Sequence, residues 1–206
     1  MDIYFLRHAS AGQPRHGRPG DDKRPLDKEG IQQCHDVGAA LKALKTKLDE
    51  IISSPLTRAH QTAEIAAGEL GHKRNIVFTD ALRPEADYAQ FQGLLGEYQD
   101  RESIMVVGHN PSLTEFLNRL LHGDGAPCLE LKKGAVAKVE QESAGTAGLK
   151  WLLTPKLARA LKAAKQTGAA STKSTKAASA KRTHSRSSRE SHAAAAKSSR
   201  PKTRSK

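Results

Sequence analysis

Short apolar runs alternate with stretches of helical periodicity along most of the chain, and this alternation limits the fold more than any other feature. The runs at residues 3–6, 49–53 and 104–107 have the length and apolar character of buried strands. Downstream of each run, apolar residues recur every three or four positions, as on the buried face of a helix. Strands that alternate with helices indicate an α/β domain with a largely parallel sheet.

Capping and turn residues predict where several elements begin and end. Asp27 is a suitable N-cap for the first helix, Ser54-Pro55 opens the second, and Gly71 is its stop signal. The first helix should bury a face formed by Ile31, Cys34, Val37, Leu41, Leu44 and Leu48. Further elements are predicted as a strand at 76–78, helices near 87–98 and 113–121, and short strands at 128–131, 135–139 and 149–153.

Charge divides the chain into two unequal parts. Residues 155–206 contain nine Lys and six Arg against one acid, Glu190, which makes +14; the whole chain carries +12, so residues 1–154 carry −2. From about residue 156 the apolar content falls to little more than alanine. Such a composition cannot bury enough surface to offset its ordering entropy. We therefore expect a domain at 1–155, a short helix or linker at 156–168, and a disordered tail at 169–206.

The sequence features of export and membrane insertion are missing from the chain. Its start, Met1-Asp2-Ile3-Tyr4, has no basic region of the kind that opens a signal peptide. No run of about 18 apolar residues occurs, so a spanning helix is not expected. Cys34 and Cys128 are too few for a disulfide framework and are expected to be reduced core residues. These observations predict a soluble cytoplasmic protein.

Four charged or ionisable side chains follow predicted strands or open a predicted helix. Arg7 and His8 come directly after the first strand, and His109 follows the strand at 104–107. Arg58 lies in the first turn of the helix after the second strand. Ligands of open α/β sheets gather beyond the carboxyl ends of the strands, so these four residues are expected to converge on one site. A helix N-terminus at that place also favours an anion.

Two arginines and two histidines in one site suit phosphoryl transfer. The planar guanidinium groups of Arg7 and Arg58 can hold phosphate oxygens bidentately and stabilise the charge that develops on them. A neutral imidazole has a lone pair that can attack phosphorus, so one histidine can form a phosphohistidine intermediate. A second, protonated imidazole would add to the phosphate cradle.

Three segments resemble the signatures of the histidine phosphatase superfamily, which includes the cofactor-dependent phosphoglycerate mutases. They are Leu-Arg-His-Ala at residues 6–9, Ser-Ser-Pro-Leu-Thr-Arg-Ala-His-Gln-Thr-Ala at 53–63, and Val-Gly-His-Asn-Pro at 107–111, in the right order. Ala9 stands where the first signature has glycine. The resemblance covers residues 1 to about 154. It implies a phosphatase with a three-layer, phosphoglycerate-mutase-like α/β domain.

Within the superfamily, the chain is most similar to the small phosphohistidine phosphatases of the SixA type. The compact body, the Arg24-Pro25-Leu26 element, Gly30 and the short region between the second and third signatures carry this resemblance. It implies that the substrate is a protein phosphorylated on histidine and that His8 is the nucleophile. It implies a phosphate pocket of Arg7, Arg58 and His109, with Arg24 and Asn110 as further candidates for substrate contact.

Glu85 keeps a second kind of substrate open. Larger family members use a carboxylic acid after the third strand to protonate the leaving oxygen, and Glu85 lies in the corresponding region. SixA-type enzymes can lack this acid, because a phosphoramidate leaves more readily than an alkoxide. The first alternative is therefore a small-molecule phosphomonoesterase that uses Glu85 as its general acid.

The remaining charged residues have simpler interpretations. Asp21-Asp22 lies in a loop rich in Gly and Pro and is expected to be a solvated pair rather than a metal site. The histidines outside the motifs show no metal-ligand spacing, so neither a metal nor another cofactor is expected. The tail at 169–206 could attract nucleic acid without sequence preference, bind an acidic protein or anionic membrane, or be a solvated extension. The second alternative is a nucleic-acid-associated scaffold whose phosphatase fold serves as a binding module.

Overall fold

The computed structural model describes residues 1–13, 20–142 and 146–164. Met1–Lys162 forms one compact unit, and of a second unit, Ala163–Lys206, the first two residues are described. The predicted domain limits at 155 and 168 stay predictions, and the predicted tail at 169–206 lies outside the described residues. Within the described ranges, no helix is long and apolar enough to cross a membrane.

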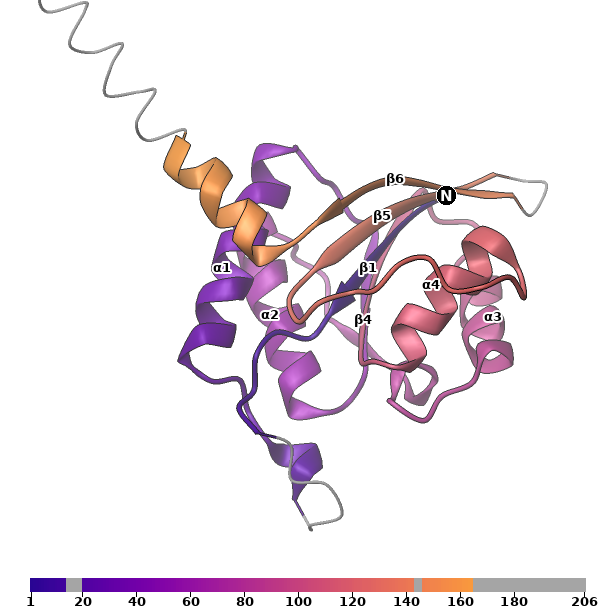
Figure 1. Ribbon diagram of the computed structural model, residues 1–206, viewed down its shortest axis with the longest axis horizontal. Helices are drawn as coiled ribbons and strands as arrows, with labels where there is room; N and C mark the ends of the chain where they lie inside the picture. Colours follow the sequence, from indigo (N-terminus) through magenta and orange to yellow (C-terminus); the bar gives the residue numbers. More distant parts are fainter. Residues whose placement is uncertain (14–19, 143–145, 165–206) are drawn as a thin grey trace, which may run out of the picture. The chain divides into compact units, whose positions relative to one another are not determined.

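A six-stranded sheet forms the centre of the domain (Figure 1). Its strands are β1 (Asp2–Arg7), β2 (Glu50–Ser53), β3 (Val77–Phe78), β4 (Ser103–Gly108), β5 (Val136–Gln141) and β6 (Ala147–Leu153). The strand order is β3-β2-β4-β1-β5-β6. The first four strands in this order are parallel to one another, whereas β5 and β6 run antiparallel to their neighbours. The predicted α/β class with a largely parallel sheet is confirmed.

Helices cover both faces of the sheet and complete three layers (Figure 1). They are α1 (Lys28–Ala43), α2 (Thr57–Leu70), α3 (Tyr88–Glu97) and α4 (Ser112–His122), with short 3-10 turns η1 (Asp21–Lys23) and η2 (Asp80–Leu82). Successive side chains of β1 serve the two cores in turn. Tyr4 and Leu6 pack in the core under α1 and α2, while Ile3 and Phe5 pack in the core under α3 and α4. The three-layer architecture is therefore confirmed.

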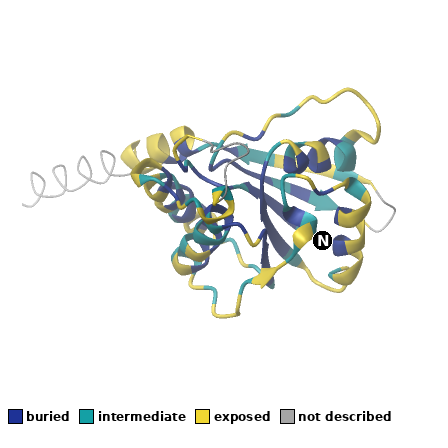
Figure 2. Cartoon of the chain, turned by 90° about the horizontal axis from the view of Figure 1, so that it is seen from below, coloured by how far each residue is buried: buried dark blue, intermediate teal, exposed yellow. Residues whose placement is uncertain are grey.

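The apolar runs of the sequence are the strands that this arrangement buries on both sides. Figure 2 shows the strands buried at the centre and exposed residues on the outer faces of the helices. In β4, residues 104–107 are fully buried, which explains why this run is continuous rather than alternating. α1 begins at its predicted N-cap, because Asp27 Oδ1 accepts a hydrogen bond from Gly30 N at 2.7 Å.

The structure corrects the predicted strand at 128–131. Asn118 of α4 binds the backbone of this segment instead: its Oδ1 accepts hydrogen bonds from the N atoms of Cys128 and Leu129, at 2.8 and 3.0 Å. Since side chains already satisfy the backbone polar groups, the segment needs no strand partner. Cys128 is consequently exposed rather than in the core, although both cysteines are free as expected.

The buried face of α1 is narrower than predicted. Ile31 and Leu44 are 43% and 58% exposed, whereas Cys34, Val37 and Leu41 are buried. The helix ends at residue 43, so Leu44 lies beyond it and does not continue the periodic face.

A last helix spans residues 155–164 as far as the chain is described. It is held to α1 by the buried carboxylate of Asp36, which is 2% exposed. Arg159 Nε donates to Asp36 Oδ2 at 2.8 Å, and Lys162 Nζ lies 3.4 Å from Asp36 Oδ1.

The carboxyl ends of β1, β2 and β4 meet at one edge of the sheet. His8 N donates to Gly108 O at 3.0 Å, and Ser54 N donates to Val107 O at 2.9 Å. Residues that directly follow these three strands are therefore neighbours in space, as the sequence analysis requires.

Candidate active site

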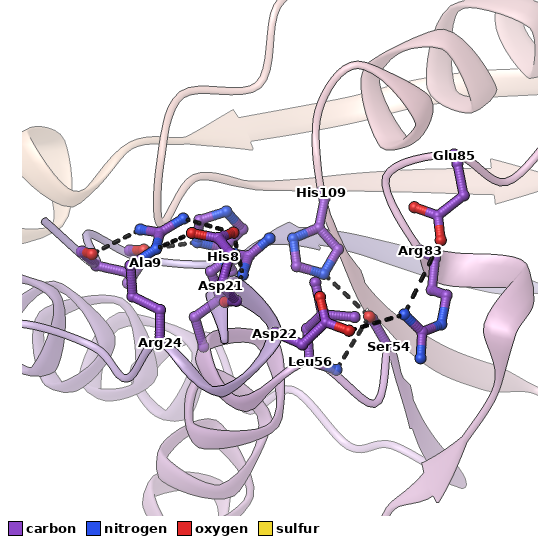
Figure 3. Close-up of polar contacts among 12 residues, drawn as sticks. His8, Ala9, Asp21, Asp22, Arg24, Ser54, Leu56, Arg83, Glu85 and His109 are labelled. Carbon is purple, nitrogen blue, oxygen red and sulfur yellow. Dashed lines mark hydrogen bonds and ion pairs between the residues drawn. The ribbon is translucent and has the colours of Figure 1, made fainter. Parts of the chain in front are cut away.

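His8 follows β1, and the backbone of the next residue orients its ring (Figure 3). Its Nδ1 lies 2.7 Å from the carbonyl oxygen of Ala9. A carbonyl oxygen only accepts hydrogen bonds, so Nδ1 carries the proton and Nε2 carries the lone pair. With 7% of its surface exposed, His8 presents an unprotonated ring nitrogen within a largely buried site.

His109 follows β4, and the centroid of its ring lies 4.9 Å from that of His8. His109 Nε2 is 2.9 Å from Ser54 Oγ, and its Nδ1 is buried without a hydrogen-bond partner. Ser54 was not among the predicted site residues, although it belongs to the second signature. The signal that could have identified it is its position directly after β2, at the edge where the other site residues gather.

Arg7 and Arg58 bring guanidinium groups from the end of β1 and from the first turn of α2. Arg7 Nη1 donates to Leu131 O at 2.7 Å, and Arg58 Nη1 donates to Asp21 O at 3.1 Å. The Nε atom of each arginine is buried and lacks a partner. Among the described residues, one other buried side-chain nitrogen outside the site, His72 Nε2, shares this property. Unsatisfied buried donors are rare, so their concentration here indicates a place for an anion.

Both imidazoles are neutral at physiological pH. Burial, reinforced by the charges of Arg58 and Arg7 and opposed by the hydrogen bond to Ala9, lowers the pKa of His8 to about 3. Burial, and after it the charges of His8 and Arg58, lowers the pKa of His109 to about 2. A protonated second imidazole was expected, but His109 is neutral in the protein without a bound phosphate. Burial removes water from His109 and the nearby charges are positive, so its protonation is disfavoured.

Arg24 reaches the site through a shared carboxylate. Arg24 Nε lies 2.8 Å from Asp21 Oδ1, and Asp21 Oδ2 lies 3.4 Å from Arg58 Nη1. Arg24 Nη1 also donates to Ala11 O at 2.6 Å. The prediction that Asp21 is solvated was wrong, because η1 packs on α2 and places this carboxylate between two arginines. Direct contact between Arg24 and a substrate stays a prediction.

The side-chain amide of Asn110 is engaged on both sides within the protein. Its Nδ2 donates to Leu131 O at 3.1 Å, and its Oδ1 accepts from Thr114 Oγ1 at 2.9 Å. Asn110 thus ties the start of α4 to the carbonyl that also binds Arg7. Contact of Asn110 with a substrate stays a prediction.

Glu85 lies at the edge of the site, next to Arg83 and beyond His109 (Figure 3). Its side chain is 69% exposed, and its Oε1 lies 3.9 Å from Arg83 Nη1. Arg83 also pairs with Asp22 at 3.6 Å and with Asp80 at 2.5 Å. Arg83 was missed by the sequence analysis, yet its charge is close enough to contribute to the low pKa of His109. The role of Glu85 as an acid stays a prediction.

The donor set of the site suits a phosphoryl group. In the part of the chain that the structure describes, no three His, Cys, Asp or Glu residues are grouped so that they could hold a metal. The N–H groups of the two arginines are hydrogen-bond donors, which fit the oxygens of a phosphoryl group.

Comparisons with known proteins agree with this arrangement. The sequence profile of the Histidine phosphatase superfamily (branch 1) matches residues 3–102. An uncharacterized protein of Picosynechococcus sp. is 33% identical over 139 residues, which cover 66% of this chain and 82% of that protein. Phosphohistidine phosphatase SixA of Escherichia coli is 25% identical over 170 residues, covering 78% of this chain and all 100% of that protein. The solved structure of the protein histidine phosphatase SixA with tungstate has the same fold, with a TM-score of 0.67 at 24% identity over 75% of this chain and 97% of that one.

Proposed function

The chain belongs to the histidine phosphatase superfamily and is a phosphatase, and on this premise we propose that it hydrolyses phosphohistidine in a protein substrate. One observation carries the proposal: the hydrogen bond from His8 Nδ1 to Ala9 O leaves Nε2 unprotonated beside two arginines. The similarity to the phosphohistidine phosphatase of Escherichia coli supports the choice of substrate.

The proposed reaction has two steps. First, His8 Nε2 attacks phosphorus, the N–P bond of the substrate breaks, and the departing imidazole takes up a proton from solvent. Second, water attacks the phosphoryl group, the bond between phosphorus and His8 breaks, and orthophosphate leaves. The water supplies the hydroxyl group of the orthophosphate. Its other proton goes to solvent and replaces the proton that the departing imidazole took up in the first step.

The other site residues would stabilise charge on the phosphoryl oxygens. Arg7 and Arg58 supply permanent positive charge, and their unpartnered Nε atoms are free to donate. Ser54 Oγ accepts from Leu56 N at 3.4 Å, which leaves its own proton for His109 Nε2. His109 then carries its proton on the unpartnered Nδ1 and donates it toward the phosphate.

The test compares wild type with His8→Ala on a protein phosphorylated on histidine and on phosphate esters. We expect kcat to fall on the order of 10³-fold or more, because the nucleophile is lost. His60→Ala is the matched control, since His60 lies on α2 with a half-exposed side chain that pairs with Glu64. Undiminished activity of His8→Ala would rule out the proposed mechanism.

Hydrolysis of phosphate esters is the second candidate function, and the exposed carboxylate of Glu85 at the edge of the site favours it. An alkoxide needs protonation as it leaves, whereas a phosphoramidate needs less help. Glu85→Gln should therefore slow ester hydrolysis by about 10²-fold and leave phosphohistidine hydrolysis within about twofold. Asp80→Asn is the control, because Asp80 also pairs with Arg83 but has no assigned role.

The proposed substrate makes a phosphorylated protein the partner of this enzyme. A cytoplasmic location is part of the proposal, and localisation of a tagged chain would test it.

A further inference from the structure

The loop at residues 9–12, which directly follows His8, fixes two groups of the site through its backbone. Ala9 O accepts the hydrogen bond from His8 Nδ1 at 2.7 Å and so selects the ring nitrogen that stays unprotonated. Ala11 O accepts from Arg24 Nη1 at 2.6 Å. The direction in which these two carbonyl groups point therefore determines the tautomer of His8 and the position of Arg24.

One carboxylate, that of Asp27, holds this loop. Asp27 Oδ2 accepts hydrogen bonds from Ser10 Oγ at 2.7 Å and from Gly12 N at 2.8 Å. Its backbone N donates to Ser10 O at 3.1 Å. Burial alone would raise the pKa of Asp27, but the hydrogen bonds from Gly30, Ser10 and Gly12 outweigh it, so the pKa is lowered. Asp27 thus remains ionised and able to accept all of these bonds.

The loop has no room to shift toward α1. A Cβ atom at Gly30 would lie 1.9 Å from Ser10 O, so the helix backbone and the loop backbone are already in contact. Gln33 Oε1 accepts from Ser10 N at 3.0 Å, and Thr62 Oγ1 accepts from Ala9 N at 3.2 Å. The Asp27 carboxylate adds its bonds to Ser10 Oγ and Gly12 N to these contacts.

A second N-cap aspartate in the same chain shows what capping alone requires. Asp87 caps α3 by accepting from Gln90 N at 2.8 Å, and Gln90 returns the bond in a capping box. Both bonds of Asp87 serve its own helix. Asp27 uses Oδ1 to cap α1 in the same way, but its Oδ2 binds the loop that follows His8.

We propose that Asp27 is a positioning residue for His8: its second carboxylate oxygen holds the loop at residues 9–12 so that Ala9 O keeps the proton of His8 on Nδ1. The proposal rests on the proposed function in one respect, that His8 Nε2 is the nucleophile. Asp27 does not touch the substrate in this scheme, and it acts through the backbone of the loop.

Asp27→Asn separates the two roles of the carboxylate. The amide oxygen can still cap Gly30 N, whereas the amide NH₂ meets the N–H of Gly12, another donor. We expect kcat to fall about tenfold while KM changes less than about twofold, because the hydrogen bonds of Arg7, Arg58 and His109 lie outside the loop at residues 9–12. Nitrogen NMR of histidine-labelled protein should show His8 as the Nδ1–H tautomer in wild type and as a mixture in the variant.

Asp27→Ala is the second variant, and it removes both carboxylate oxygens. It should therefore lower kcat even if the amide of Asp27→Asn turns its oxygen toward the loop and keeps a bond there. Asp87→Asn and Asp87→Ala are the matched controls and should keep both kcat and the His8 tautomer of wild type. Wild-type kcat and an unchanged tautomer in Asp27→Ala, or equal losses in the Asp87 variants, would overturn the proposal. If wild type turns over no phosphorylated substrate, the proposed function fails, but the tautomer measurement still tests the role of Asp27.

Discussion

His8 and His109 lie with their rings 4.9 Å apart beside two arginines, and both stay neutral far below the ordinary pKa of histidine. For a nucleophile this is an advantage, since protonation would occupy the lone pair of Nε2. For His109 the consequence differs. A phosphate dianion beside it would raise its pKa, so its charge follows the ligand rather than the solution.

The buried neutral state of His8 predicts that acid destabilises the protein. Between pH 6.5 and pH 3 the unfolded chain protonates His8 while the folded chain does not, so the unfolded state binds more protons and gains stability as pH falls. Between pH 7 and pH 5, wild type should therefore lose about 2 kcal/mol more unfolding free energy than His8→Asn.

Urea titrations at these two pH values measure this difference. His60→Asn serves as the control: its partly exposed side chain lies outside the site, and the variant keeps the buried His8. This variant should lose stability in parallel with wild type. Equal losses in wild type and His8→Asn would contradict the assignment of a buried, neutral His8.

At the scale of elements, the helix at 155–164 depends on one buried carboxylate of α1. Burial by itself would raise the pKa of Asp36, but the hydrogen bonds from Arg159, Gln32 and Lys162 outweigh it and lower the pKa. Asp36→Asn removes the charge that both basic residues share. We expect a loss of about 1–3 kcal/mol in unfolding free energy, because charged hydrogen bonds at a buried site are lost.

Asp124→Asn provides the comparison for Asp36→Asn. Asp124 also pairs with an arginine, Arg119, but its side chain is 87% exposed, so its loss should change stability by less than about 1 kcal/mol. Hydrogen exchange should be faster at residues 155–164 in Asp36→Asn and unchanged in Asp124→Asn. The opposite ranking of the two variants would show that Asp36 does not anchor this helix.

Element predictions succeeded where local sequence and tertiary environment agree. The strand at 104–107 was identified because a central strand buried on both faces is apolar throughout. The segment at 128–131 also contains apolar residues, but side chains of α4, rather than a neighbouring strand, bind its backbone. Local composition does not contain that choice, because it depends on where α4 lies.

For the whole molecule, the parallel arrangement of β1, β2 and β4 creates the site. Each strand delivers its following residue to the same edge, and the two helical layers bury the sheet so that the site is largely shielded from water. Shielding strengthens the interactions of the arginines with a phosphoryl group and lowers the pKa values of the imidazoles by the same cause.

The basic segment at 169–206 lies outside the described residues, and its binding to nucleic acid remains a prediction. It carries six Lys and five Arg against Glu190, or +10. Deletion of these residues should abolish binding to a DNA duplex while turnover persists. Binding by the full chain should weaken steeply between about 50 and 200 mM salt, which fluorescence anisotropy can follow.

Two results would contradict the prediction that residues 169–206 bind DNA while the rest of the chain carries the phosphatase activity. If the full chain does not bind the duplex at low salt, the nucleic-acid prediction fails. If the full chain binds DNA but has no phosphatase turnover, the scaffold alternative is favoured over the enzyme.

From its sequence alone, this protein could be identified as an α/β phosphatase, and Arg7, His8, Arg58 and His109 could be predicted as its site. Periodicity and motifs are properties of neighbours along the chain, so they can be read without a structure. The tertiary structure alone decided which nitrogen of His8 is free, where Glu85 lies, and that Asp27 binds the loop after His8. The partner of His8 Nδ1 is its neighbour Ala9, but the backbone at Ala9 is positioned by contacts between residues far apart in sequence, such as Ser10 with Asp27. The geometry of such contacts, like that of His109 with Ser54, is encoded by no local pattern.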